Sequence, residues 1–509
     1  MKATIAPRTY TIEEYTRSVC PQCIAKGGVR SDDPNVFVDA MLVSHSGSIW
    51  MRRYCHEHGE TESLYEEDAE IWRSRSGWQT QTLTMTPDRA DNFAGFPDGY
   101  REGLPASHGQ HSCILLLNLT EHCNYKCPTC YATALEPSTP APQTEKPSLP
   151  ELLHTVDTMI EREGGRISVV MLSGGEPTLR RDLEELIEEL VKRPVTRILL
   201  NTNGRRILKD KAFQKFLHQH RSKVEVYLQF DGLRDSTYEH LRAAPLAQEK
   251  LDTLKVLNDN KIFITLVATL KKGVNDDEIE DLFQLGLATP FCSGLALQPV
   301  FGSGRNSGID PLDRITPTGV IRRSGKADDF IPLPCSHKDC CDIAYFIQDD
   351  KGKWNSLVSL IGRDELKKWI HLASNSISFE NVHESLKKMI KDGTLQRILS
   401  EQQRASSLQV AGDLFKMCDC VPGLTDLMGG IWKAFGGEER LLENMAMKTF
   451  RVTVKMFMDS HTFHEARIRQ CCVHVGTFEE DPRRYSFCWR WLFEDAEDFP
   501  SRKSTLRMI

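Results

Sequence analysis

The chain has 509 residues, of which 40% are hydrophobic and 27% are charged, and its formal net charge is −7. This composition predicts a soluble globular protein, and the length is sufficient for two or three domains with cores of their own. The acidic balance argues against a nucleic-acid-binding surface. No run of about 18 apolar residues occurs and the N-terminus has no hydrophobic stretch, so we expect a cytoplasmic protein.

Sixteen cysteines are distributed unevenly along this sequence. A framework of disulfide bonds is not expected in the reducing cytoplasm. We therefore interpret most of them as metal ligands.

Residues 1–75 are predicted to form a small metal-binding module. Cys20-Pro-Gln-Cys23 precedes strand-like stretches at 36–43 and 49–54, which lead into Cys55-His56-Glu57-His58-Gly59. A hairpin flanked by cysteines is typical of a zinc ribbon or a rubredoxin-like iron site, where four ligands enclose one metal ion. Only three cysteines are present, so the fourth ligand is His56, His58 or a distant cysteine such as Cys113. The alternative is a degenerate module that no longer binds metal.

Residues 76–112 have no clear period and contain several Gly and Pro residues, which predicts a connecting segment. Its His108 and His111 are expected to be surface groups rather than ligands.

Residues 113–305 alternate strand-like and helical stretches. The strand-like runs are 113–117, 167–172, 197–200, 224–230, 262–270 and 295–300, and the helical ones include 149–163, 182–192, 236–258 and 276–287. This alternation predicts an α/β domain, with a parallel sheet that curls into a partial barrel and helices outside it.

A group of three cysteines follows the first of these strands, with the spacing Cys123-x3-Cys127-x2-Cys130, and Tyr131 comes next. Three thiolates at this spacing can hold three corners of a 4Fe-4S cluster and leave the fourth iron open. The alternatives are a zinc site or free buried thiols. The motif resembles that of the radical S-adenosylmethionine (SAM) superfamily, whose open iron binds SAM and whose fold is a partial (β/α)6 barrel.

A second motif, Gly174-Gly175-Glu176-Pro177, lies directly after the second predicted strand. Glycines at that place let the backbone approach a ligand closely. In the superfamily this motif holds the amino group of SAM. A lone motif of this kind would be only a turn, but its position after the cysteines and a strand favours the SAM site.

Polar residues also follow later strands, where the carboxyl ends of a parallel sheet face the ligand. By resemblance, Asn203 and Gln229 would lie near the ribose and methionine parts of SAM, and Arg242 would pair with its carboxylate. Asn-Gly and Asp-Gly pairs are equally ordinary turn residues, and this alternative stays open.

Residues 306–509 are predicted to be a cysteine-rich, mainly helical extension, with helical patterns at 363–373, 382–390 and 395–403. Its cysteines indicate at least one auxiliary iron-sulfur cluster, and the alternative is that they are buried thiols.

The whole layout further resembles a narrower group, the radical SAM enzymes related to tetraether lipid synthase (macrocyclic archaeol synthase). That resemblance implies a mononuclear iron or zinc site at Cys20, Cys23 and Cys55. It also implies an auxiliary cluster held by Cys335, Cys340, one or both of Cys471 and Cys472, and Cys488. Relatives have extra cysteines where residues 100–105 have none. One auxiliary cluster is therefore absent or uses Cys418 and Cys420.

The function implied is reductive cleavage of SAM to a 5′-deoxyadenosyl radical, hydrogen abstraction from an unactivated carbon and carbon–carbon bond formation on lipid chains. The stretches 424–435 and 452–458 would line an apolar channel, or else belong to the core. The implied partners are a reducing protein such as ferredoxin or flavodoxin and, for a lipid substrate, a peripheral membrane contact. The alternatives are a methylase or alkyltransferase acting on a soluble small molecule, and a peptide-modifying enzyme.

Overall fold

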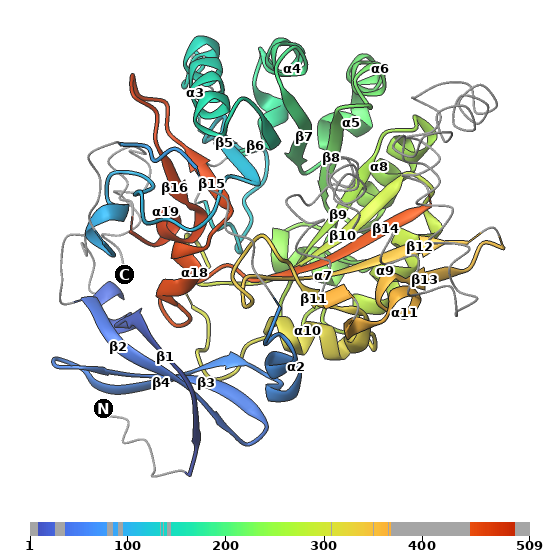
Figure 1. The fold of residues 1–509 in the computed structure, drawn as a ribbon. Helices are drawn as coiled ribbons and strands as arrows, with labels where there is room; N and C mark the ends of the chain where they lie inside the picture. Colours follow the sequence, from blue (N-terminus) through green and yellow to red (C-terminus); the bar gives the residue numbers. More distant parts are fainter. Residues whose placement is uncertain are drawn as a thin grey trace, which may run out of the picture.

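The computed structural model describes residues 9–25, 36–78, 85–89, 95–132, 134–135, 137–139, 144–306, 308–349, 351–364, 366–367 and 448–493. An antiparallel sheet near the N-terminus and a large, mostly parallel sheet form two separate layers (Figure 1). None of the described helices is both long and apolar enough to cross a membrane.

The N-terminal sheet has the strand order β1-β2-β3-β4. Its elements are β1 (Thr11–Val19), α1 (Pro21–Ala25), β2 (Phe37–His45), β3 (Ser48–Cys55), β4 (Gly59–Glu66) and α2 (Ala69–Ser74). A small core of Leu42, Ile49, Met51 and Trp72 lies on one face of this sheet. Asp68 accepts hydrogen bonds from the first amides of α2 and so defines where that helix begins.

The large sheet is built around six neighbouring parallel strands, as the sequence predicts. They are β5 (Ile114–Asn118), β6 (Ile167–Ser173), β7 (Val195–Thr202), β8 (Val224–Gln229), β9 (Ile264–Leu270) and β10 (Cys292–Pro299). The intervening helices are α3 (Leu149–Arg162), α4 (Leu183–Val191), α5 (Arg205–Lys209), α6 (Lys211–Gln219), α7 (Asp235–Arg242), α8 (Ala247–Asp259) and α9 (Ile279–Ala288), with a 3-10 turn at Pro177–Leu179.

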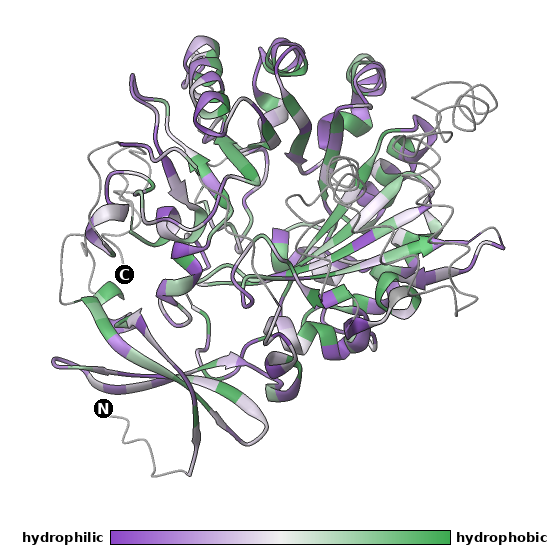
Figure 2. Cartoon of the chain, viewed as in Figure 1, coloured by the Kyte–Doolittle hydropathy of each residue, from purple (hydrophilic) through white to green (hydrophobic). Residues whose placement is uncertain are grey.

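Alternate side chains of each strand serve two different cores. Leu115 and Leu117 of β5 pack toward the helices, whereas Ile114 and Leu116 belong to a second core on the opposite face. Figure 2 shows strands that are mainly hydrophobic and helices α3, α4 and α6 that combine hydrophobic and hydrophilic residues. Burial on both faces explains why the strands read as continuous apolar runs.

The described part of the C-terminal region adds strands to both sides of this sheet, so the expectation of a mainly helical extension is wrong for these residues. β14 (Thr449–Lys455) pairs in parallel with β10, and β15 (Val473–Gly476) pairs in parallel with β5. The remaining elements are a 3-10 turn at Asp98–Tyr100, α10 (Pro317–Arg323), a 3-10 turn at Ala327–Asp329, β11 (Ile331–Pro332), β12 (Cys341–Gln348), β13 (Trp354–Ser356), α11 (Leu357–Ile361), α18 (Glu465–Arg469), β16 (Arg484–Ser486) and α19 (Phe487–Phe493). Most of the predicted helices at 363–373, 382–390 and 395–403 lie outside the described residues.

The large sheet is curved around a cavity of about 240 Å³. Side chains from β5, β9, β14 and β15 all line this cavity, although these strands are distant from one another in the strand order. A flat sheet could not bring them to one space, so the sheet forms the predicted partial barrel.

Candidate functional site

Cys123, Cys127 and Cys130 all line the cavity from the loop that follows β5. Burial raises the pKa of Cys123 to about 12, and it also raises the pKa of Cys127. Metal binding would therefore have to displace protons from these thiols. The sulfur atoms of these three cysteines do not all lie within 4.8 Å of one another. Sulfur ligands of a single tetrahedral zinc ion would lie about 3.8 Å apart. The wider spacing fits separate irons of a cluster better than a single metal ion.

The glycines of the second motif allow β6 to end against the cysteine loop. Gly174 has φ +121°, and a Cβ atom there would lie 2.4 Å from the carbonyl oxygen of Thr120. At Gly175 a Cβ atom would lie 2.1 Å from the carbonyl oxygen of His122. No side chain fits at either position, so the backbone of this motif can approach the cysteine loop and the cavity.

Glu176 is buried and connects its own loop to the end of β7. One carboxylate oxygen accepts hydrogen bonds from the hydroxyls of Thr178 and Thr202, both at 2.6 Å. The other accepts one from the amide of Asn203 at 2.8 Å. Glu176 therefore braces the site, and its contact with the amino group of SAM stays a prediction.

The predicted SAM-binding residues of the later strands are gathered by a lysine that the sequence did not single out. Lys250 of α8 donates to the carbonyl oxygen of Asn203 at 2.5 Å and to the side-chain oxygen of Gln229 at 2.8 Å. Burial lowers the pKa of Lys250 to about 8. The sequence shows Lys250 only as one of many polar residues in a helical stretch, because the burial of a cation by distant strands has no local sequence signal.

Arg242 lies at the cavity, but its guanidinium group is occupied by the protein. It forms an ion pair with Asp231 and donates to the hydroxyl of Thr269 at 2.8 Å. The pairing of Arg242 with the carboxylate of SAM stays a prediction.

Tyr131 and Arg305 stabilise the outer side of the cysteine loop. The ring of Tyr131 packs against Phe301, Phe487 and Trp491. Arg305 donates to the carbonyl oxygens of Cys127 and Ala134. Arg305 is a second residue that sequence analysis did not identify, since it follows β10 and is distant from the loop in sequence.

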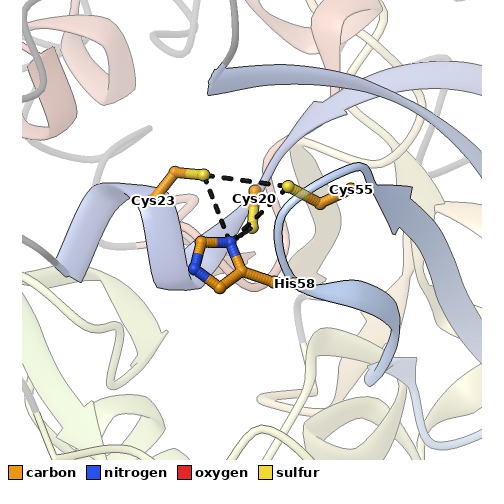
Figure 3. Close-up of side chains that lie close together, drawn as sticks. All are labelled: Cys20, Cys23, Cys55 and His58. Carbon is orange, nitrogen blue, oxygen red and sulfur yellow. Dashed lines mark hydrogen bonds between the residues drawn. The ribbon is translucent and has the colours of Figure 1, made fainter.

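Four residues of the N-terminal module converge so closely that they could hold one metal ion (Figure 3). The Nδ1 atom of His58 lies 3.5 Å from Cys20 Sγ, 3.4 Å from Cys23 Sγ and 3.6 Å from Cys55 Sγ. These distances match those between tetrahedral ligand atoms around zinc, which are about 3.8 Å. His58 is therefore the fourth member, rather than His56 or Cys113.

A second cysteine group forms where β5 and β15 begin and just after β11 ends. Cys113, Cys335 and Cys472 are buried within 4.8 Å of one another, and Cys335 Sγ lies 3.9 Å from Cys472 Sγ. The chain is held there because the amides of Cys113 and Ile114 donate to the carbonyl oxygen of Cys472. Three buried thiols without a disulfide fit an auxiliary metal centre.

This grouping changes the predicted auxiliary set. Of the expected ligands, only Cys335 and Cys472 belong to the triad, and Cys113 replaces the others. Cys340 accepts a hydrogen bond from Arg467, Cys488 accepts one from the amide of Met458, and Cys471 donates to the carbonyl oxygen of Val473. Cys418 and Cys420 lie outside the described residues.

The two histidines of the connecting segment lie close to this triad, and His108 is buried whereas His111 is half-buried. His111 Nε2 is 3.4 Å from Cys113 Sγ, and buried His108 is hydrogen-bonded to the hydroxyl of Tyr100. The expectation for His108 is wrong because the connecting segment is covered by the C-terminal region, which local sequence cannot reveal.

Comparison with known proteins gives matches to both parts of this arrangement. Residues 117–286 match the family model of the radical SAM superfamily, and residues 12–67 match the model described as the HMPTM N-terminal zinc ribbon domain. A 7,8-dihydro-6-hydroxymethylpterin dimethyltransferase of Methanocaldococcus jannaschii is 24% identical over 510 aligned residues, which cover 94% of this chain and 93% of that protein.

More distant matches cover only part of their proteins. The mitochondrial GTP 3′,8-cyclase of Arabidopsis thaliana is 26% identical over 223 residues, or 41% of this chain and 54% of that protein. This chain therefore spans about half the length of that relative. Among solved structures, Streptococcus suis SuiB bound to precursor peptide SuiA aligns with a TM-score of 0.36 and 15% identity, over 44% of this chain and 46% of that chain. A TM-score this low supports no conclusion about this chain.

Each family match contains one of the three cysteine groups, the loop of Cys123, Cys127 and Cys130 in the first and the N-terminal group of Cys20, Cys23 and Cys55 in the second. The chain therefore contains a radical SAM domain and an N-terminal zinc ribbon domain of the HMPTM type.

Proposed function

We propose that this radical SAM enzyme transfers a methyl or other alkyl group to an unactivated carbon of a small molecule. The observation that carries the proposal is one cavity of about 240 Å³ that contains both the SAM-cluster cysteines and the inner face of the sheet. A substrate in this cavity would lie against the place where the radical forms. The near full-length similarity to a pterin dimethyltransferase favours a small heterocyclic substrate.

The protein's own residues would hold and orient the reactants. Cys123, Cys127 and Cys130 would hold a 4Fe-4S cluster, which supplies the electron that cleaves SAM to methionine and a 5′-deoxyadenosyl radical. Lys250 fixes the backbone of Asn203 and the side chain of Gln229 at the cavity. A low-potential protein such as ferredoxin or flavodoxin would deliver the electron.

The buried triad of Cys113, Cys335 and Cys472 would hold an auxiliary iron-sulfur centre. Its position behind the inner face of the sheet supports a role near the substrate, because Cys341 is adjacent to this region and lines the cavity. We propose that the N-terminal site of Cys20, Cys23, Cys55 and His58 is structural, since all four ligand positions are supplied by the protein.

Lipid-chain coupling, the reaction implied by the resemblance to tetraether lipid synthase, remains a second candidate. The comparisons do not support a lipid substrate, because the relative that matches almost the whole chain carries the name of a pterin dimethyltransferase. One observation still favours an apolar substrate: Ile114, Leu116, Met171, Leu199 and Val473 form an apolar wall of the cavity.

The stretch 452–458 is divided between the two expected places. Val452 and Val454 pack in the core between the sheet and its helices, whereas Thr453, Lys455 and Phe457 line the cavity. The stretch 424–435 lies outside the described residues.

The test uses anaerobically reconstituted protein with SAM and dithionite. We expect 5′-deoxyadenosine and a methylated product from 7,8-dihydro-6-hydroxymethylpterin, detected by mass spectrometry with methyl-labelled SAM. The Cys127→Ala variant should form neither product. Formation of 5′-deoxyadenosine that rises only with a lipid extract would favour the second candidate, and its formation by Cys127→Ala would contradict the radical SAM assignment.

A further inference from the structure

The cavity has two chemically different walls. β15, β5, β6 and β7 contribute the apolar side chains Val473, Ile114, Leu116, Met171 and Leu199. The opposite strands β8, β9, β10 and β14 contribute mainly polar side chains, which are Tyr227, Gln229, Thr265, Thr269, Gln298, Arg451, Thr453 and Lys455, together with the apolar Val267, Leu295 and Pro299. A molecule that fills this space would therefore place one apolar side and one polar side against complementary walls.

Among the described residues, four cationic side chains line the cavity, and three of them are engaged by the protein. Arg242 pairs with Asp231, Arg451 pairs with Glu225, and Arg305 donates to two backbone carbonyls. Each of these three guanidinium groups therefore already has a partner within the protein.

Lys455 differs from the other three. Within the described part of the chain, its ammonium group has no carboxylate within ion-pair distance and no hydrogen-bond acceptor, and its nearest aromatic ring is Phe457 at 5.4 Å. Lys455 is the last residue of β14 and is half-buried. On the neighbouring antiparallel strand β12, it is paired with Cys341. Burial opposes the charge of Lys455, but four nearby cysteines raise its pKa: Cys472, Cys341, Cys471 and Cys340. With no carboxylate beside it, the ammonium group is stabilised only by thiolates or by an anion that enters the cavity.

Two neighbouring groups can complete an anion-binding subsite. Gln298 follows Leu297, which pairs with Val454, so Gln298 and Lys455 are adjacent on the polar wall. The side-chain amide of Gln298 donates to the hydroxyl oxygen of Tyr227 at 3.0 Å. Burial raises the pKa of Tyr227 to about 12, so this hydroxyl keeps its proton and can donate it to a ligand.

We propose that Lys455 anchors an anionic group of the substrate, a phosphate ester or a carboxylate, with the hydroxyl of Tyr227 as a second donor. This inference rests on the proposed function and deepens it: the substrate is an anionic molecule whose apolar part lies along the opposite wall. The reactive carbon then faces the loop of Cys123, Cys127 and Cys130, which closes the same cavity.

The rival explanation is that Lys455 balances the charge of a cluster at Cys335 and Cys472. Lys455 lines the cavity, whereas Cys113, Cys335 and Cys472 are buried next to it and do not line it. The ammonium group can therefore meet a ligand directly, and the two explanations predict different measurements.

The test uses full-length, anaerobically reconstituted protein and two pairs of probes. The first pair is 7,8-dihydro-6-hydroxymethylpterin and its phosphate monoester, and the second is dodecanol and dodecyl phosphate. Equilibrium dialysis in the presence of SAM gives the dissociation constants. We expect the anionic member of at least one pair to bind roughly 10- to 100-fold more tightly than its neutral partner.

Three variants isolate the role of Lys455. Lys455→Gln should lose the anion preference, and Lys455→Arg should retain a part of it. Lys255→Gln is the matched control, because it removes one exposed lysine of α8 that pairs with Asp259. This control should bind all four probes as the wild type does.

Each further outcome has a defined meaning. No anion preference in the wild type, or an equal preference in Lys455→Gln, would overturn the proposal. An altered reduction potential of the iron-sulfur centres in Lys455→Gln, with ligand preference unchanged, would assign the lysine to the cluster and also overturn it. If neither pterin is methylated but dodecyl phosphate binding depends on Lys455, the pterin assignment fails while the anion subsite stands.

Discussion

Arg242 and Asp231 form a buried ion pair in which two nitrogen atoms of the guanidinium group each lie 2.7 Å from a different carboxylate oxygen. Asp231 also accepts a hydrogen bond from the amide of Thr269 at 2.9 Å. The pair therefore ties α7 to the ends of β8 and β9 and fixes the position of the arginine at the cavity.

Removing the charge of Asp231 should destabilise the protein strongly. Asp231→Asn leaves the guanidinium group of Arg242 buried without its counter-charge, which costs about 3–5 kcal/mol. Urea unfolding measures this loss. In the control Asp277→Asn, which breaks the exposed ion pair with Arg234, we expect a change below about 1 kcal/mol. Equal losses in the two variants would show that the buried pair has no special role.

Adding one methyl group at Gly175 should disturb the cysteine loop. The new Cβ atom of Gly175→Ala would meet the backbone oxygen of His122 at 2.1 Å, and a backbone atom cannot rotate away. We expect a loss of roughly 1–3 kcal/mol in the free energy of unfolding and less iron per chain. Gly95→Ala is the control, because its Cβ atom meets nothing within 4 Å. Normal iron content in Gly175→Ala would contradict the close approach.

His58 and His56 should differ in their effect on metal content. His58→Ala removes one of the four converging ligands and should lower bound zinc per chain, measured by elemental analysis after chelation of loosely held metal. His56→Ala should keep its zinc, since the His56 ring packs edge-on against Tyr54 and is outside the ligand group. Equal zinc loss in both variants would reject the ligand assignment.

Lys250 should make stability depend on pH above neutrality. Its pKa falls from 10.5 to about 8 because burial disfavours the charged form. Between those pH values the unfolded chain binds more protons than the folded one, so stability rises with pH through this window. We expect the free energy of unfolding of the wild type, minus that of Lys250→Met, to increase by at most about 1.4 kcal/mol per pH unit in this window.

The same comparison should be flat between pH 6 and about 7, where Lys250 is protonated in both states. Because both proteins contain the same thiols and histidines, their titration cancels in the difference. Urea unfolding at a series of pH values measures it, and a difference that shrinks as pH rises would contradict the lowered pKa.

Local patterns predicted the six central strands well, because each strand is a short apolar run bounded by turn residues. The stretch 236–258 was less accurate: it forms two helices, α7 and α8, separated around Ala243 and Pro245. Ala243 has φ +61°, which ends the first helix, and proline cannot continue it.

The sequence by itself determined the cysteine spacing of the SAM site, the glycines beside it and the alternation of strands and helices, because these depend on neighbours along the chain. Only the tertiary structure decided that His58 completes the zinc ribbon and that Cys113 meets Cys335 and Cys472. It also placed β14 and β15 beside the central strands and left Lys455 facing the cavity. These outcomes depend on which distant strands pair, and strand pairing is set by burial across the whole fold rather than by any local period.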